Sequence, residues 1–198
     1  MTRAHIPEVV CIHLRSFPKF FLSILGSGFL AVLYQEILAD PSGIGLVCVQ
    51  NGKVLGLVAG TDAPNGFYRR LLYRRWWRFA MAASTPVLQN PMLFPRLLNA
   101  LRKPQQAASF RDVCELMSIA VDPAVQGGGI GRRLLQGFAR EACGRGCRYV
   151  HLTTDQADND RVNQFYVTQG FQVARVITTP QGRILNEYKI VLDDIAVQ

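Results

Sequence analysis

A glycine-rich turn between a buried strand and a helix is the part of the sequence best suited to chemistry. The turn reads QGGGIG over residues 126–131. Glycines let the backbone come close to a ligand, and the free N–H groups at a helix start point outward. Because the positive end of the helix dipole lies at the same place, the turn is suited to an anion such as a pyrophosphate.

Three nucleotide-binding patterns compete for this turn. A Walker loop ends in Gly-Lys-Ser/Thr, but two arginines follow Gly131, which excludes that pattern. A dinucleotide fingerprint needs G-x-G-x-x-G, and the spacing of Gly127, Gly129 and Gly131 is one residue short. The pattern Q/R-x-x-G-x-G/A fits Gln126, Gly129 and Gly131. A glycine-rich turn without a ligand is the remaining interpretation.

The elements on either side of the turn position it. The run Glu115–Val121 is strand-like and stops at Asp122-Pro123, because proline cannot donate to a sheet ladder. After the turn, apolar residues recur at helical spacing, which predicts a helix. These residues are Leu134, Leu135, Phe138 and Ala142.

The rest of the chain alternates between helical and strand-like patterns. The expected helices cover residues 6–17, 19–38, 91–101 and 159–169, and the expected strands cover 45–50, 53–60, 149–154, 171–178 and 184–192. Asn51-Gly52 is a strong hairpin signal and predicts that the first two of these strands are antiparallel neighbours.

Composition limits the class of protein. The 198 residues are 49% hydrophobic and 18% charged, which predicts one globular domain over residues 1–198. A net charge of +8 suits phosphorylated small molecules, but without a lysine-rich tail or zinc-finger spacing we expect no nucleic-acid partner. Five scattered cysteines indicate reduced thiols in a cytoplasm and no metal site. The apolar run 20–34 is too short to span a bilayer.

Two segments together resemble the GNAT N-acetyltransferase superfamily. The first is SIAVDP followed by the Q-x-x-G-x-G turn, and the second is LTTDQADNDRVNQFYVTQGF. In the family's closing segment an Asn opens a helix, a Tyr follows two turns later and Gly-Phe starts the next strand. Asn159, Tyr166, Gly170 and Phe171 take these places. The resemblance implies an α/β (α+β) GNAT fold: a mixed, mostly antiparallel central sheet flanked by helices, here with a helical insertion over residues 62–110.

The resemblance also implies acetyl-CoA as co-substrate. Backbone groups of the strand would pair with the pantetheine arm, and the turn would hold the pyrophosphate together with Arg132. Asn159 would contact the CoA molecule near the pantetheine. The implied cofactor-binding residues are Ile119, Val121, Gln126, Gly127, Gly128, Gly129, Gly131, Arg132 and Asn159.

In such an enzyme an amine attacks the thioester directly, so proton transfer is the remaining task. By the resemblance, Tyr166 would protonate the departing thiolate, since a phenol and a thiol have similar acidity. The amide of Ile119 would meet the oxyanion. Glu115 is the candidate general base, because it lies two residues before Met117 and so on the same strand face. A strand-end carboxylate in solvent is the alternative for Glu115.

The long insertion has a basic and aromatic helix candidate over Tyr68–Ala83. Arg70, Arg74 and Arg78 are four residues apart and are expected to share one side. Arg74 and Arg78 are predicted to bind an anionic acceptor as part of a lid. A patch that touches a membrane surface and a solvated arginine face over packed aromatic residues are the alternatives.

These features favour an N-acetyltransferase that moves an acetyl group from acetyl-CoA to a primary amine. A small-molecule acceptor such as an amino sugar or a nucleotide-linked sugar is expected, since arginine matches phosphate geometry. The alternatives are a protein or peptide N-acetyltransferase and a non-catalytic acyl-CoA-binding or membrane-associated module. A homodimer that forms through the insertion is a further alternative. The sequence departs from the family in having no evident strand before its first helix.

Overall fold

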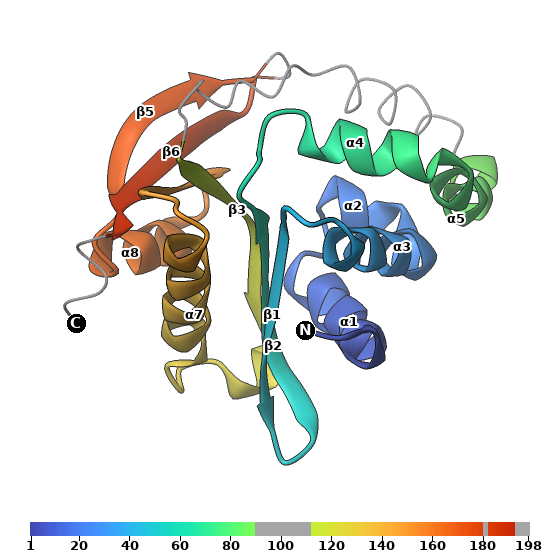
Figure 1. The fold of residues 1–198 in the computed structure, drawn as a ribbon, viewed down its shortest axis with the longest axis horizontal. Helices are drawn as coiled ribbons and strands as arrows, with labels where there is room; N and C mark the ends of the chain where they lie inside the picture. Colours follow the sequence, from blue (N-terminus) through green and yellow to red (C-terminus); the bar gives the residue numbers. More distant parts are fainter. Residues whose placement is uncertain (90–111, 180–181, 193–198) are drawn as a thin grey trace.

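A six-stranded sheet with strand order β1-β2-β3-β4-β6-β5 forms the centre of the protein (Figure 1). The computed structural model describes residues 1–89, 112–179 and 182–192. Neighbouring strands are antiparallel except β3 and β4, which are parallel. The strands are β1 (Gly43–Gln50), β2 (Lys53–Thr61), β3 (Val113–Val121), β4 (Tyr149–Asp155), β5 (Gln172–Thr178) and β6 (Ile184–Val191).

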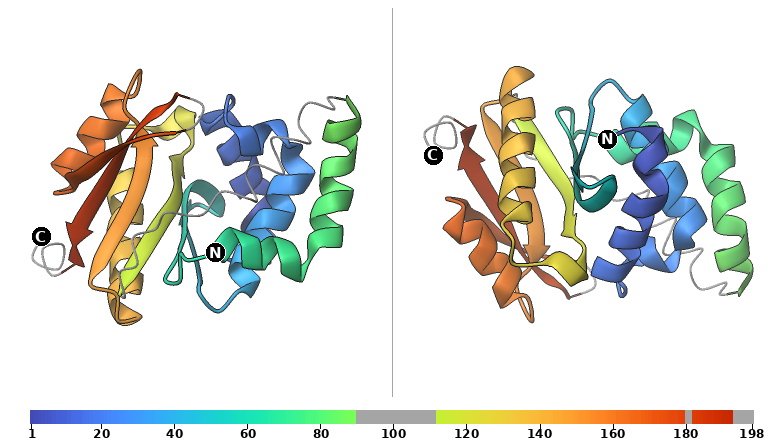
Figure 2. Two further views of the ribbon diagram at one scale, coloured as in Figure 1. Left: turned by 90° about the horizontal axis from the view of Figure 1, so that it is seen from above. Right: turned by 90° about the horizontal axis from the view of Figure 1, so that it is seen from below.

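Helices cover both faces of the sheet, with α1 to α3 on one side and α7 on the other (Figures 1 and 2). The helices are η1 (Arg3–His5), α1 (Ile6–Ser16), α2 (Phe21–Ile24), α3 (Gly26–Ala39), α4 (Phe67–Arg74), α5 (Trp76–Gln89), η2 (Pro123–Val125), α7 (Ile130–Gly144) and α8 (Asp160–Thr168). This arrangement confirms the predicted mixed, mostly antiparallel sheet flanked by helices.

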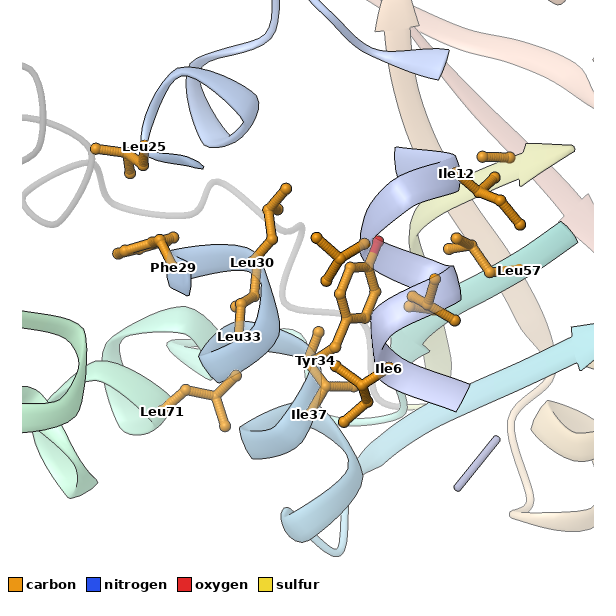
Figure 3. Packing of buried hydrophobic residues seen from close by; sticks show 14 of the residues in the cluster. Ile6, Ile12, Leu25, Phe29, Leu30, Leu33, Tyr34, Ile37, Leu57 and Leu71 are labelled. Carbon is orange, nitrogen blue, oxygen red and sulfur yellow. The ribbon is translucent and has the colours of Figure 1, made fainter. Parts of the chain in front are cut away.

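Two clusters of buried side chains fix the helices to the sheet. In the first, Tyr34 of α3 lies between α3 and α1 near Ile6 (Figure 3) and is 1% exposed. Its hydroxyl is 2.8 Å from Nδ1 of His13 on α1. In the second, Phe138 of α7 and Val150 of β4 are fully buried. Since burial of large apolar side chains stabilises packing on both faces, the sheet is held as a rigid platform.

An irregularity in the ladder between β2 and β3 shapes the central strand. Gly60 pairs with Leu116 and Ala59 with Ser118, so Met117 is an extra residue, as in a β-bulge. A Cβ atom on Gly60 would lie 2.2 Å from the carbonyl oxygen of Glu115, so only glycine fits there. The sequence analysis did not predict this bulge, which bends β3 next to the point where it leaves β4.

Two helices expected to be continuous are broken, which corrects the predicted boundaries. The helix expected over residues 19–38 begins as the short α2 and restarts at Gly26, whose φ is +86°. The helix expected over Tyr68–Ala83 breaks at Arg75 into α4 and α5. Arg74 and Arg78 therefore lie on different helices and do not share one side. The helix expected over residues 91–101 lies outside the described residues.

The chain begins with a short 3-10 helix rather than a strand. Arg3–His5 form η1, and the described residues before α1 contain no strand. The amino group of Met1 donates to the carbonyl oxygen of Gly45 at 3.0 Å, so the N-terminus is held beside β1.

Candidate active site

The parallel strands β3 and β4 diverge and open a cleft between them. Their register covers three residue pairs and ends with Glu115 opposite His151. Beyond this pair, residues 116–121 and 152–155 form two walls of a cavity of about 930 Å³. Because the described parts of β3 and β4 share no ladder here, their backbone groups can hydrogen-bond a ligand that enters the cleft. A cavity of this size accepts a cofactor-sized molecule.

The glycine-rich turn forms one end of the cleft. Gly127 and Gly129 have φ angles of +93° and +70°, a conformation that glycine adopts without strain. Gly129 is the N-cap of α7, so the first N–H groups of this helix face the turn. Nothing lies within 4 Å of where a Cβ on Gly129 would be, so the backbone is open to a ligand. The positive helix end and these amides form an anion site.

Most of the predicted cofactor-binding residues meet at this cleft. Those on its wall are Ile119, Val121, Gln126, Gly127, Gly129, Gly131, Arg132 and Asn159. Gly128 belongs to the same turn but does not line the wall. Gly131 lies close to Phe165, since a Cβ there would be 3.5 Å from its ring. The turn and α8 therefore approach each other across the cleft.

Tyr166 lies on α8 and lines the cleft. Its ring packs at 5.5 Å from Phe171 and 5.7 Å from Tyr188, measured between centroids, and the residue is 5% exposed. Its hydroxyl has no hydrogen-bond partner among the described residues. Burial raises the pKa of Tyr166, so the phenol stays protonated at neutral pH. A fixed, protonated phenol at the cleft wall can donate a proton to a ligand atom.

Asn159 holds the loop between β4 and α8. It is the N-cap residue of α8, and its Nδ2 donates to Oγ1 of Thr154 and to the carbonyl oxygen of Asp155. Asn163 donates to the same carbonyl at 3.1 Å. These bonds tie the start of α8 to the end of β4. The cleft wall that carries Asn159 is therefore well ordered at the place where the two elements meet.

Glu115 lies at the closed end of the cleft, next to the lining residue Leu116, but does not itself line the wall. Its Oε2 is buried without a hydrogen-bond partner in the described part of the chain. Burial, and then the charge of Glu187, raise the pKa of Glu115 to about 7. Burial and the charge of Glu115 in turn raise the pKa of Tyr68, which packs against the same cluster of buried side chains as Met117 of β3.

A group of polar side chains from three strands surrounds this end of the cleft. Glu187 of β6 accepts from Nε of Arg175 at 2.5 Å and lies 3.5 Å from Nε2 of His151. Burial lowers the pKa of His151, so its imidazole is mostly neutral at pH 7. A buried carboxyl with a pKa near neutrality, beside a second carboxylate and an imidazole, is typical of a site for proton transfer.

The sequence matches the family described as acetyltransferase (GNAT) family over residues 12–171. The chain belongs to the GNAT acetyltransferase family. It is therefore an N-acetyltransferase, and the fold predicted from the GNAT resemblance is confirmed. No curated protein sequence matches the chain significantly.

Solved GNAT structures share this fold at low sequence identity. An aminoglycoside 6′-acetyltransferase type Ii has a TM-score of 0.63 and 14% identity, with 97% of this chain and 94% of that chain covered. The ribosomal-protein-S18-alanine N-acetyltransferase from Escherichia coli has a TM-score of 0.58 and 16% identity, with 97% and 90% covered. An aminoglycoside 6′-N-acetyltransferase complexed with coenzyme A has a TM-score of 0.62 and 13% identity, with 96% and 92% covered. These neighbours act on acceptors of different classes, so the shared fold leaves the acceptor open.

The structure places the two predicted acceptor-binding arginines away from the cleft wall of this GNAT enzyme. Arg78 donates to Oε1 of Glu36 at 2.5 Å and to Gln35, both on α3. This pair joins α5 to α3. Arg74 is exposed at the end of α4. Neither lines the described cavity, so their contact with an acceptor stays a prediction.

Two arginines of the GNAT cleft were not predicted from the sequence. Arg161 lines the cleft from the first turn of α8. Arg183 lines it from the residue directly before β6, and its Nη2 donates to both carboxylate oxygens of Asp155 at 2.7 Å. Arg161 follows Asn159 by two residues and could have been found from that motif. Arg183 comes from the distant hairpin, and no local pattern pointed to it. Within the described ranges, no cluster of His, Cys, Asp or Glu could hold a metal ion, and no helix is long and apolar enough to cross a membrane.

Proposed function

We propose that this enzyme transfers the acetyl group of acetyl-CoA to a primary amine on a small molecule by direct attack. The observation that carries the proposal is the cleft between β3 and β4, which has an anion site in its glycine-rich turn and Tyr166 on its wall, with Glu115 beside the point where the two strands diverge. A bound acetyl-CoA supplies an activated thioester carbonyl. An amine acceptor then needs only a route for its proton, an oxyanion donor and an acid for the thiolate.

The residues of the anion end fit the charged part of CoA. We infer that the amides of residues 127–131 hold the pyrophosphate and that Arg132 and Arg161 add positive charge at the same end. The backbone of Ile119 and Val121 would pair with the amide-containing arm, and Asn159 would bind beside it. Gln126 also lines this end, and its Nε2 lies 3.4 Å from the carbonyl oxygen of Val121.

In this proposal Glu115 and Tyr166 supply the proton transfers. Glu115 accepts the proton of the attacking amine, because its raised pKa of about 7 is matched to a neutral operating pH. The amide of Ile119 stabilises the oxyanion. Tyr166 then donates its proton to the departing thiolate and is restored from solvent. In this scheme no residue forms a covalent bond to the acetyl group.

The position of α4 supports a compact acceptor. Tyr68, near the start of this helix, packs against the same cluster of buried side chains as Met117 of β3, and the charge of Glu115 contributes to its raised pKa. A helix on this side of β3 would leave less room for an extended peptide than for an amino sugar or a nucleotide-linked sugar. Arg74 and Arg78 belong to the proposal as contacts of an anionic group on such an acceptor. All five cysteines are free thiols, which supports a reaction in a reducing compartment such as the cytoplasm.

Two measurements test this function. Calorimetry with acetyl-CoA, CoA and ATP should show binding of the first two and none of ATP. Turnover is then followed as thiol release with amino sugars, nucleotide-linked amino sugars and N-terminal peptides as competing acceptors. Preferred acetylation of a sugar amine supports the proposal. A folded sample that binds no acetyl-CoA would overturn it, and a higher kcat/KM for peptides would replace the acceptor with a protein N-terminus.

A further inference from the structure

The helix α5 is fixed to α3 by one of its faces. Phe79 and Ala83 are each 3% exposed, and the ring of Phe79 lies 5.2 Å from that of Phe29 on α3. The ion pair of Arg78 with Glu36 holds the same face. Since these contacts set the rotation of α5 about its axis, its other face must point outward.

Most of the described side chains on the outward face of α5 are apolar. Side chains on it share helical spacing and exposure: Trp76 (65% exposed), Trp77 (45%), Ala80, Met81 (63%), Ser84 and Leu88 (81%). The Ser84 hydroxyl donates to the carbonyl oxygen of Met81 at 2.7 Å, which satisfies its only donor within the helix. A surface helix normally carries charged residues on this face. A mostly apolar face with two exposed tryptophans indicates an interaction surface.

The exposed charges at the start of this face are positive. The insertion over residues 62–110 contains eight arginines and lysines and one acidic residue, Asp62, so it carries +7 of the net charge of +8. Arg74 and Arg75 are exposed where α4 meets α5, directly before Trp76. A mostly apolar face beside two exposed arginines complements a surface that is both apolar and negatively charged.

We propose that the outward face of α5 and the arginines at the α4–α5 corner dock the protein on an anionic phospholipid surface. Tryptophan prefers the boundary between acyl chains and headgroups, and each nearby arginine strengthens attraction to anionic lipid. The 14 residues of α5 span about 21 Å, so the helix lies in the plane of the membrane and does not cross it. Figure 2 shows α5 at the edge of the protein farthest from β5 and β6, so these strands stay clear of the surface.

The chain carries its own probe for this docking. It has two tryptophans, Trp76 and Trp77, and both lie on the proposed surface. Vesicles that mix phosphatidylglycerol with phosphatidylcholine should shift the tryptophan emission to shorter wavelength, and brominated lipids should quench it. Vesicles of phosphatidylcholine alone should bind far more weakly, and added salt should release the protein from the anionic vesicles.

A charge-reversed variant and a matched control separate this surface from net charge. Arg74→Glu with Arg75→Glu should lower vesicle partitioning at least roughly 25-fold, since each nearby arginine contributes roughly fivefold. Arg3→Glu with Arg140→Glu makes the same change in charge at exposed sites on η1 and α7 and should retain most of the binding. Circular dichroism confirms that both variants fold. Equal losses in the two variants would mean that net charge alone drives binding and would overturn the proposal.

A second variant tests the apolar contribution. Met81→Gln with Leu88→Gln keeps both tryptophans and all charges but removes exposed apolar area from the face, and it should weaken partitioning at least tenfold. Unchanged partitioning, or an unshifted emission with anionic vesicles, would overturn the proposal. A different result is a tryptophan emission that is already shifted without lipid, together with a dimer in sedimentation that this variant dissociates. That result would assign the face to a second copy of the chain and overturn the proposal.

Discussion

Glu115 and His151 form the last residue pair that joins β3 to β4 before the two strands diverge. The pair therefore stands at the vertex of the cleft, where a thioester and an attacking amine would meet. Glu187 lies within 3.5 Å of His151, and its charge acts on Glu115. The vertex thus combines a carboxyl whose pKa lies near neutrality with a second carboxylate, Glu187, whose charge contributes to that raised pKa.

Glu115→Gln should lower kcat/KM by about 10²–10⁴, the usual contribution of a positioned general base. The carboxylate is the active form, so the wild-type rate should rise with pH through about 7 and then level off. In the variant this limb should disappear, because glutamine does not titrate. A pH profile of kcat/KM checks the prediction. A variant with the wild-type limb would show that another group accepts the proton.

Glu187→Gln should move the same limb to lower pH. The negative charge of Glu187 opposes ionisation of Glu115 and so contributes to its raised pKa. Without that charge, Glu115 should ionise more readily, and the enzyme should keep more of its activity under mildly acidic conditions. Asn186→Asp serves as a contrast, because it adds a negative charge on β6 one residue away, whereas Glu187→Gln removes one. A limb that stays at its original pH in Glu187→Gln would contradict the coupling between the two carboxyls.

Tyr166→Phe should reduce kcat by about 10²-fold or more while leaving the KM for acetyl-CoA nearly unchanged. The phenol packs against Phe171 and Tyr188, and phenylalanine fills nearly the same space. The variant should therefore fold normally and lose only the proton donor. Tyr188→Phe is the matched control, since its hydroxyl donates to Oδ1 of Asn163 and not to the cleft. If Tyr166→Phe kept full kcat, a water molecule would have to protonate the thiolate.

Local patterns were enough to predict which residues gather around the glycine-rich turn of the cleft, but not which residues meet where β3 and β4 diverge. The turn before α7 depends on residues adjacent in sequence, and the N-cap Asn159 and Tyr166 lie on one short helix. The partners of Glu115 could not be found in this way. His151 and Glu187 come from strands whose pairing is set by the whole sheet. The bulge at Met117 likewise depends on the close approach that Gly60 permits.

In the insertion, local sequence patterns do not predict how the arginines are placed. The shared side predicted for Arg70, Arg74 and Arg78 requires one continuous helix, and the break at Arg75 changes the direction of the side chains that follow it. Arg78 then pairs with Glu36 of α3, a contact that local spacing cannot reveal. Its predicted role toward an anionic acceptor must compete with this ion pair. The fold class could be predicted because two local motifs carry the GNAT resemblance, whereas these contacts depend on tertiary packing.

Gly129→Ala should weaken binding of acetyl-CoA about tenfold or more, measured by calorimetry. Its φ of +70° strains any residue with a Cβ, and the added methyl group would project into the space open to the ligand. Gly146→Ala is the matched control, since Gly146 has a φ of +81°, equally open surroundings and a place beyond the end of α7. Both variants should lose about 1 kcal/mol of stability. Equal binding by the two variants would exclude the turn from the cofactor site.

His13→Gln should change how the free energy of unfolding depends on pH. His13 is 3% exposed, and burial lowers its pKa to about 4, so the folded protein keeps the imidazole neutral. In the unfolded chain the imidazole takes up a proton near pH 6.5. Its contribution to stability is therefore complete above that pH and is lost as the pH falls from 6.5 toward 4, by about 2 kcal/mol between pH 7 and 5.

Glutamine can still hydrogen-bond the hydroxyl of Tyr34, which lies 2.8 Å from Nδ1 of His13, but it does not titrate. Urea unfolding of both proteins at pH 7 and pH 5 isolates the histidine, because Glu115 is present in both. The raised pKa of Glu115 has the opposite effect, because it lowers the stability of the protein as the pH rises from 4.5 to 7. The wild-type protein should lose about 2 kcal/mol more than the variant on acidification. An equal loss in the two proteins would mean that His13 takes up a proton in the folded state without disturbing the contact between α1 and α3.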